Sequence, residues 1–456
     1  MKKIRFSEAL IILLLMLIIL GTAVIKFGLS PQIPVLFVIA LLILWAKLRG
    51  ASWDNIHQGI QEGISTAIIP IFIFILIGAL IAVWIQAGII PTIMVAGFNL
   101  ISIHYFVPST FIVCSLVGVS IGSGFTTIST IGIALFGMGV AMNANPALVA
   151  GAIISGAVFG DKMSPLSDST NLSAAIAGSD LFAHIKNMMW STIPSFVVSL
   201  ILFWILGNTN TQFNASKIAH TMTTLQQNFM ISWWAILPIL LMFVCAWRRI
   251  PAIPTLFLNI IVTVIMIFIQ KPQMTLSKLT NLISEGFVAH TNDTTVNTLL
   301  TRGGITSMMA TVSLIIVTLS LGGILMKFNV VQSAMEPLVK HLRKPGRLIT
   351  VTILSGIGIN LFVGEQYLSV ILPGKAFKSA FEKIGLSPLA LSRVLEDGGS
   401  VINYLIPWGV AGSFAASALG VPVLHFLPFA FFSLFSPVFS ILSGITGIGL
   451  KWAKNK

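Results

Sequence analysis

The stretch that decides the fold is Gly160-Asp161-Lys162-Met163-Ser164-Pro165-Leu166-Ser167-Asp168-Ser169-Thr170-Asn171, which directly follows the apolar run 147–159. It places two carboxylates, one lysine and several hydroxyl and amide oxygens beside a segment apolar enough for a membrane interior. Charged side chains are costly in hydrocarbon, and those found in membrane segments usually line the path of a solute. We therefore predict that this stretch lines such a path.

The composition of the chain indicates a protein that lies in a membrane. Hydrophobic residues make up 56% of the 456 residues and charged residues only 9%, and the mean hydropathy is +0.98. Too few polar side chains remain to cover a soluble fold of this size. Because each span needs roughly 20 apolar residues, we predict an all-α integral membrane protein, a polytopic bundle of about 10–13 transmembrane helices.

Apolar windows of that length locate the expected spans. Full spans are predicted at 8–28, 31–47, 65–87, 107–122, 190–207, 230–247, 251–270, 304–326, 346–363 and 422–448. Shorter or interrupted apolar runs occur at 90–103, 124–142, 146–160, 364–379, 386–396 and 404–420, and these cannot all be simple spans. The polar stretch 208–229 is predicted to be a loop outside the membrane.

The formal net charge of +13 comes from basic residues at the ends of spans, among them Lys47, Arg49, Arg248 and Arg249. Basic residues concentrate in the cytoplasmic loops of membrane proteins. The pattern therefore predicts a cytoplasmic N-terminus, and it explains the charge without nucleic-acid binding.

The two halves of the chain share a pattern. Later elements correspond at spacings of 236 to 242 residues, as in Asn145-Pro146 with Ser387-Pro388 and Asp161 with Asp397. Duplicated halves with interrupted helices are typical of secondary transporters, so we predict two repeats with re-entrant hairpins. The expected units are an N-terminal hairpin at 1–50, a first repeat at 51–207, a linker loop with connecting helices at 208–270, a second repeat at 271–449 and a basic tail at 450–456.

The segment after residue 160 has the chemistry of a Na⁺ site. A bare Na⁺ needs several oxygen ligands, and the stretch from Ser164 to Asn171 supplies hydroxyls, an amide and a carboxylate. Pro165 should break the helix there and free backbone carbonyls. We expect Asp161, Ser164 and Asp168 to hold the ion, with Asp161 as the carboxylate for which Na⁺ and H⁺ compete. An ion pair with Lys162 is the structural alternative for Asp161, and a helix cap is the alternative for Asp168.

Charged residues elsewhere complete the predicted site. Lys162 either compensates Asp161 or extends to the membrane interface, and Glu396 or Asp397 takes the role of Asp161 in the second half. Arg393 is spaced for an intrahelical pair with either acid. The polar breaks of both halves should line one cavity, and they comprise Thr126, Thr127, Ser129, Glu365, Gln366 and Asn403.

The run from Phe159 to Leu172 closely resembles the NhaC-type Na⁺/H⁺ antiporter family, and the likeness continues through Glu365-Gln366-Tyr367 and Leu395-Glu396-Asp397. The resemblance implies a bacterial inner-membrane antiporter of the ion-transporter superfamily, with paired re-entrant hairpins. Its acidic and hydroxyl motif falls on Asp161, Ser164, Asp168, Thr170 and Asn171. The chain departs from the family pattern at Asn403-Tyr404 and at Gly409, which affects the solute that it carries.

We therefore expect exchange of Na⁺ for H⁺ by alternating access, with no enzymatic activity and no cofactor. The alternative is exchange of a small organic anion or amino acid of the malate/lactate type. An intramembrane aspartyl protease with Asp161 and Asp397 as its dyad is a remote third function, because the G-x-G-D pattern is absent. The expected partners are the lipid bilayer, the two ions, a small organic solute in the alternative function, and a second copy in a homodimer.

Overall fold

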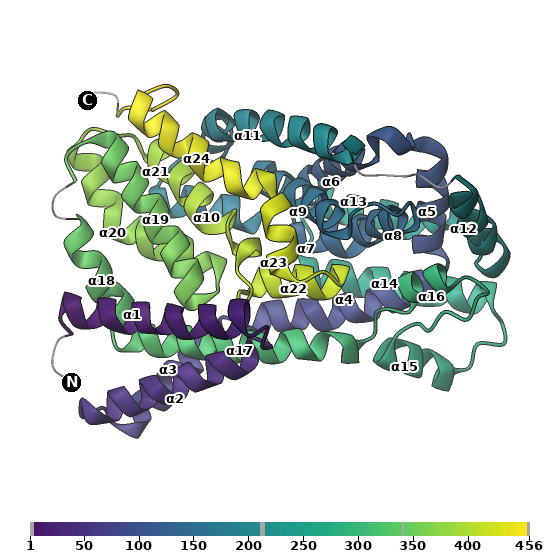
Figure 1. The fold of residues 1–456 in the computed structure, drawn as a ribbon, viewed down its shortest axis with the longest axis horizontal. Helices are drawn as coiled ribbons and strands as arrows, with labels where there is room; N and C mark the ends of the chain where they lie inside the picture. Colours follow the sequence, from purple (N-terminus) through teal and green to yellow (C-terminus); the bar gives the residue numbers. More distant parts are fainter. Residues whose placement is uncertain (1–3, 210–214, 340–341, 454–456) are drawn as a thin grey trace.

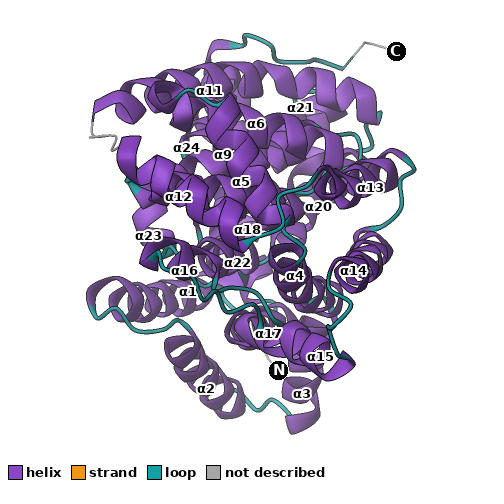
Figure 2. Ribbon diagram, turned by 90° about the vertical axis from the view of Figure 1, so that its right-hand side faces the viewer, coloured by secondary structure: helices purple, strands orange, loops and turns teal. Residues whose placement is uncertain are grey.

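The computed structural model describes residues 4–209, 215–339 and 342–453, which form a helical bundle (Figure 1). These residues contain two isolated bridges but no strand. Eight helices are long and apolar enough to cross a membrane, or ten if each of two bent helix pairs is one span. The predicted all-α membrane fold is confirmed. Figure 2 shows several of the helices end-on, and so roughly parallel to one another.

The N-terminal hairpin consists of α1 (Phe6–Gly21), which a π-helical turn extends to Lys26, and α2 (Gln32–Leu48). Both helices are apolar on all sides, which suits contact with lipid. They pack against α17 and α18 of the second half.

The first half continues from α3 to α11. Its helices are α3 (Trp53–Ser65), α4 (Ile68–Gln86), α5 (Ile89–Leu100), α6 (Phe106–Ile121), α7 (Gly124–Thr127), α8 (Ile133–Ala141), α9 (Pro146–Met163), α10 (Asp168–Ala177) and α11 (Leu181–Thr209). A π-helical turn joins α7 to α8, so 124–141 is one continuous helix. This helix and α9 are each long enough to span, although the sequence predicts only short runs there.

Three helices connect the halves: α12 (Ala215–Asn228), α13 (Ile236–Trp247) and α14 (Ala252–Gln270). The loop predicted at 208–229 is therefore wrong for the part that α12 occupies, and residues 210–214 lie outside the described residues. The error has a physical reason. Ile218, Thr221 and Leu225 recur at helical spacing and are buried, so α12 is amphipathic despite its polar composition.

The second half runs from α15 to α24. Its helices are α15 (Leu276–Glu285), α16 (Thr294–Leu300), α17 (Ile305–Lys327), α18 (Val330–Val339), α19 (Pro345–Val363), α20 (Gln366–Lys383), α21 (Pro388–Leu395), α22 (Val410–Leu419), α23 (Val423–Phe426) and α24 (Phe431–Thr446). A π-helical segment at 396–400 prolongs α21. The single span predicted at 422–448 is wrong, because Pro428 lies between α23 and α24 and cannot donate a helical hydrogen bond.

The two halves repeat the same helix order with a constant offset. Gly122 and Gly364 end α6 and α19 in the left-handed conformation, and they lie 242 residues apart, as do Gly178 and Gly420 at the ends of α10 and α22. Only glycine adopts that conformation without strain. The shared stops show that corresponding helices end at matching positions.

Corresponding helices run in opposite directions. The N–H of Gly304, at the start of α17, bonds the carbonyl of Gly78 far along α4 at 2.7 Å. The end of α3, at Gly63, instead approaches Leu319. Helices α11 and α24 are also antiparallel, because Trp190 contacts Gly449 while the rings of Phe203 and Phe431 lie 4.9 Å apart. The repeats are therefore inverted.

Close glycine contacts hold each repeat together. A Cβ atom on Gly160 of α9 would lie 2.4 Å from the Cα of Gly118 on α6. In the second half, a Cβ on Gly356 of α19 would lie 2.9 Å from the carbonyl of Gly398. Small residues let membrane helices approach closely enough for backbone contact. The ends of α9 and α21, which carry the acidic residues, are thereby fixed against α6 and α19.

Candidate functional site

A cavity of about 1050 Å³ is lined by residues of both halves. They come from α4, α7, α10, α14 and α20 and from the segment between α9 and α10. Thr66, Arg249 and Pro251 line the cavity and are exposed. The cavity therefore reaches the protein surface beside the turn between α13 and α14.

Aromatic rings form a buried wall of this cavity. Phe74 and Phe125 line it, and the ring of Phe414 stacks on that of Phe74 with centroids 4.9 Å apart. The ring of Phe125 lies 5.1 Å from Phe414 and 5.7 Å from Tyr404. Because Phe74, Phe414 and Tyr404 are buried, the wall is continuous with the apolar core.

The helix break predicted from Pro165 is present. Helix α9 ends at Met163, and Ser164 is extended with φ −84° and ψ 131°. Proline has no amide hydrogen, and it disfavours helix in the residue before it. The chain becomes helical again when the Ser167 hydroxyl accepts the N–H of Thr170 at the start of α10.

Side chains of α10 bind the carbonyls that the break exposes. Thr170 Oγ1 donates to the carbonyl of Lys162 at 3.0 Å, and Asn171 Nδ2 donates to the carbonyl of Pro165 at 3.0 Å. Fewer backbone oxygens are therefore free for an ion than the sequence predicts. Asn171 lines the cavity, whereas Ser164 is fully buried and accepts the N–H of Leu166.

Asp161 lies in the last turn of α9 with a half-buried side chain that lines the cavity. Its carboxylate faces the Ser167 hydroxyl and the N–H of Gly124, and the charges of Asp168 and Glu396 act on it. The ion pairs found among the described residues do not include Asp161. Its charge is thus available to a cation in the cavity.

Comparison with known proteins identifies the family. The sequence profile described as "Na+/H+ antiporter family" matches residues 4–169 and 156–448. The chain belongs to this family. It is 39% identical to the "Na(+)/H(+) antiporter NhaC" of Alkalihalophilus pseudofirmus, over 98% of this chain and 97% of that protein. The predicted NhaC-type resemblance is confirmed.

Two other relatives of this antiporter-family chain have different names. The chain is 34% identical to the "Arginine/ornithine antiporter ArcD" of Halobacterium salinarum, over 98% of this chain and 93% of that protein. It is 31% identical to the "Malate-2H(+)/Na(+)-lactate antiporter" of Bacillus subtilis, over 100% of this chain and 98% of that protein. These relatives are all transporters.

Lys162 corrects two predictions. Its side chain is 1% exposed, and Nζ binds Asp397 Oδ1 at 2.5 Å, so it neither pairs with Asp161 nor extends to the membrane interface. Nζ also donates to the hydroxyls of Ser191 at 3.2 Å and Ser436 at 2.8 Å. Neighbouring helical residues point about 100° apart, which directs Lys162 away from the face that carries Asp161.

The two acids of the second half occupy different surroundings. Glu396 is fully buried and accepts hydrogen bonds from the hydroxyls of Ser169 at 2.8 Å and Ser173 at 2.5 Å. Asp397 binds Lys162, so it does not form a protease-like dyad with Asp161. Neither acid lines the cavity, and at the offset of 242 residues the counterpart of Asp161 is Asn403.

Arg393 does not make the predicted pair with Glu396 or Asp397. Its guanidinium donates to the Ser443 hydroxyl at 2.9 Å and to the Gly449 carbonyl at 3.2 Å. The reason is direction, because α21 turns this face toward α24. Arg393 therefore joins the end of α24 to α21.

The predicted polar breaks line the cavity only in part. Thr126, Glu365, Gln366 and Asn403 line it, whereas Thr127 and Ser129 are buried and donate to backbone carbonyls one turn earlier. Glu365 caps α20 by accepting the N–H of Leu368 at 2.8 Å.

Several functional candidates escaped sequence analysis. Tyr367 and Arg249 line the cavity, and Ser191 and Ser436 bind the Lys162 ammonium. The 242-residue offset places Tyr367 opposite Phe125 and would have found it. No sequence signal distinguishes Arg249 or the two serines from other residues of their type.

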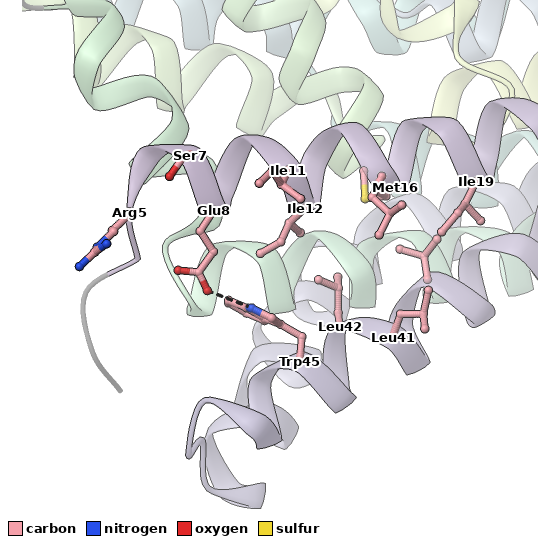
Figure 3. Close-up of a pocket in the computed structure, with 12 residues that line it drawn as sticks. Arg5, Ser7, Glu8, Ile11, Ile12, Met16, Ile19, Leu41, Leu42 and Trp45 are labelled. Atoms are coloured by element: carbon pink, nitrogen blue, oxygen red, sulfur yellow. Dashed lines mark hydrogen bonds between the residues drawn. The ribbon is translucent and has the colours of Figure 1, made fainter.

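A second pocket lies in the N-terminal hairpin between α1 and α2 (Figure 3). Most of its lining is aliphatic, and its acidic residue, Glu8, already accepts the indole N–H of Trp45 at 3.1 Å and pairs with Arg49 at 3.2 Å. This pocket therefore lacks the free oxygen ligands that the cavity offers to a cation.

Proposed function

We propose that this protein exchanges Na⁺ for H⁺ across the bacterial cytoplasmic membrane by alternating access, with Asp161 as the coupling carboxylate. One observation carries the proposal: a carboxylate without a basic partner lies at a helix break and lines a cavity that reaches the surface. Membership of the Na⁺/H⁺ antiporter family supports it.

The chemistry follows from the single negative charge of Asp161. A proton and a Na⁺ each neutralise that charge, so each reduces the affinity of the carboxylate for the other. If the site faces the two sides of the membrane in turn, this competition couples the two flows. Asp168 is the second proposed ligand, because its charge acts on Asp161 and its side chain lines the cavity.

The remaining predicted ion ligands have less direct roles in this proposal. Ser164 and Thr170 shape the break through their hydrogen bonds, and Asn171 fixes its carbonyls. Glu396 adds negative charge near Asp161. Asp397 compensates Lys162.

The cavity in this proposal opens to the cytoplasm. Its exposed rim includes Arg249, from the basic Arg248-Arg249 turn, and basic loops of bacterial membrane proteins stay on the cytoplasmic side. The aromatic wall formed by Phe74, Phe125, Phe414 and Tyr404 then separates the ion site from the other side of the membrane. Both chain termini lie at the left edge of Figure 1, and both have basic sequences, which places them in the cytoplasm as well.

Exchange of a small organic solute is the second candidate function. The cavity of about 1050 Å³ is far larger than one Na⁺ requires, and it is large enough for a small organic molecule. Arg249 at the rim could bind a carboxylate group of such a solute. The names of the arginine/ornithine and malate/lactate relatives support this alternative.

Purified protein in liposomes separates the two functions. The internal pH is recorded while Na⁺, Li⁺, K⁺, malate, lactate, arginine or ornithine is added outside. Na⁺ alone should move protons if the main proposal holds. Movement of Na⁺ that requires an organic solute would replace it with the alternative.

A further inference from the structure

A row of buried polar side chains lies between α11 and α24, outside the cavity. Ser433, Ser436, Ser440 and Ser443 recur at spacings of three and four residues and so share one face of α24. Lys162 Nζ binds both Ser436 and Ser191, so this face meets α11 at the Lys162–Asp397 pair. We call this row the serine seam.

The seam contains polar atoms that lack partners within the described residues. The hydroxyls of Ser433 and Ser440, both ring nitrogens of His184 and the Oδ2 atom of Asp397 accept or donate no hydrogen bond there. All four residues are 0% exposed. The charges of Lys162 and Asp397 act on His184, so His184 belongs to the same cluster.

Close packing of small residues does not account for this pattern. Ser195 and Ser199 on α11 show the ordinary arrangement, because each donates to the carbonyl four residues earlier at 2.6 Å. Buried polar groups without such a bond are normally satisfied by ordered water. The unpartnered seam atoms therefore point to a chain of bound water molecules.

The seam leads from the surface to Asp397. Ser443 bonds the exposed Ile448 carbonyl and the Arg393 guanidinium at one end. Ser436 lies seven residues, or about 10 Å, further along α24 and donates to Asp397 Oδ1. Beyond Ser433, the rings of Phe431 and Phe203 pack 4.9 Å apart and close the seam.

We propose that the serine seam is a hydrated proton path from the cytoplasmic surface to Asp397, separate from the cavity that admits Na⁺. A hydronium ion in the seam gives its proton to Asp397 Oδ2 and leaves water, and the reverse step releases the proton. Lys162 remains an ammonium throughout and keeps its bonds to Ser191 and Ser436. The titratable groups that face Asp397 are Lys162 of α9, His184 of α11, Arg393 of α21 and the adjacent Glu396.

This inference rests on the proposed Na⁺/H⁺ exchange, because the path delivers the protons of that exchange. Protonation of Asp397 leaves the Lys162 charge uncompensated beside Asp161. A positive charge in low-dielectric surroundings disfavours a second cation nearby. A proton at the end of the seam therefore opposes Na⁺ at the break without occupying the same oxygen.

The test compares two kinds of exchange in liposomes. Replacing Ser440 with valine (Ser440→Val) fills the seam with methyl groups, and Ser199→Val is the matched control, because its hydroxyl is bonded within its own helix. Na⁺-driven proton movement is measured with a pH dye, and ²²Na⁺/Na⁺ exchange is measured at equal pH on both sides. Ser440→Val should lose most of the proton movement and retain ²²Na⁺/Na⁺ exchange, while Ser199→Val should retain both.

Other outcomes overturn the inference. Equal loss of both exchanges in Ser440→Val would make the seam structural, and unchanged proton movement would exclude it as the path. Absence of both exchanges in the unmodified protein would instead reject the proposed function. Hydroxyl-radical footprinting of the unmodified protein adds a test that needs no variant: His184 should be labelled despite its burial, and an unlabelled His184 contradicts bound water there.

Discussion

The two helix breaks use the same backbone device for different purposes. Pro165 and Pro407 lie 242 residues apart, and each precedes a short helix that ends at a left-handed glycine. At the same offset, Asp161 of the first break corresponds to Asn403 of the second. Asp161 presents a carboxylate without a basic partner, whereas Asn403 uses both atoms of its amide within the protein.

The bonds of Asn403 show what the second break contributes. Its Nδ2 donates to Asn360 Oδ1 at 2.7 Å, and its Oδ1 accepts the N–H of Ala411 at 3.0 Å. It therefore fastens the broken segment to α19 and α22. The comparison teaches that duplication supplied the shape of the cavity twice, while the chemistry of the ion site stayed in one half.

The largest expected effect comes from exchanging the two side chains. Asp161→Asn should abolish Na⁺-driven proton movement, because an amide cannot take up a proton at neutral pH. The double variant D161N/N403D should remain inactive, since position 403 is committed to Asn360 and Ala411. Proton movement in liposomes is the measurement, with membrane insertion as the control. Activity in the double variant would show that the breaks are interchangeable.

The next effect concerns the ion pair that joins the two halves. Lys162→Met should destabilise the protein by about 3–5 kcal/mol, because it leaves the Asp397 carboxylate buried without its cation. The double variant K162M/D397M should recover most of that loss, since no buried charge remains. Thermal unfolding in detergent measures both. A single variant as stable as the unmodified protein would mean that the pair contributes little to joining the halves.

A smaller effect is expected at Asn403. Asn403→Ala should cost about 1–3 kcal/mol of stability, because it leaves the N–H of Ala411 and the Asn360 carbonyl oxygen unpaired. Transport per folded molecule should change little. The comparison with Asp161→Asn is direct when both variants are normalised to folded protein by size-exclusion chromatography. A complete loss of transport in correctly folded Asn403→Ala would give the second break a chemical role.

The smallest effect is expected at the cavity rim. Arg249→Gln removes an exposed positive charge and should raise the apparent Na⁺ affinity by about twofold, the size of an exposed charge interaction. The gain should shrink when choline chloride raises the ionic strength, because the Debye length falls to about 10 Å at 0.1 M. Titration of transport with Na⁺ at two choline concentrations measures it. A loss of transport instead would place Arg249 in solute binding and favour the organic-solute alternative.

The sequence by itself determined the membrane fold, the breaks and the family. Runs of apolar residues leave no alternative to helices in a bilayer, because every backbone polar group must be bonded internally there. Pro165 and the paired helix starts are local signals, so the interrupted helix and the repeat were predictable. The amphipathic helix α12 was missed only because composition was weighed above periodicity.

Tertiary structure decided which charges meet. Lys162 and Asp397 are 235 residues apart and lie on different repeats, so no local spacing predicts their contact. Local spacing instead suggested pairs between Lys162 and Asp161 and between Arg393 and the acids beside it, and both were wrong. Helix rotation sets which residues face a cavity and which face a neighbouring helix, and that rotation is fixed by packing between helices distant in sequence. The inverted direction of the repeats has the same origin, because it depends on how the spans pass through the membrane and not on any single residue.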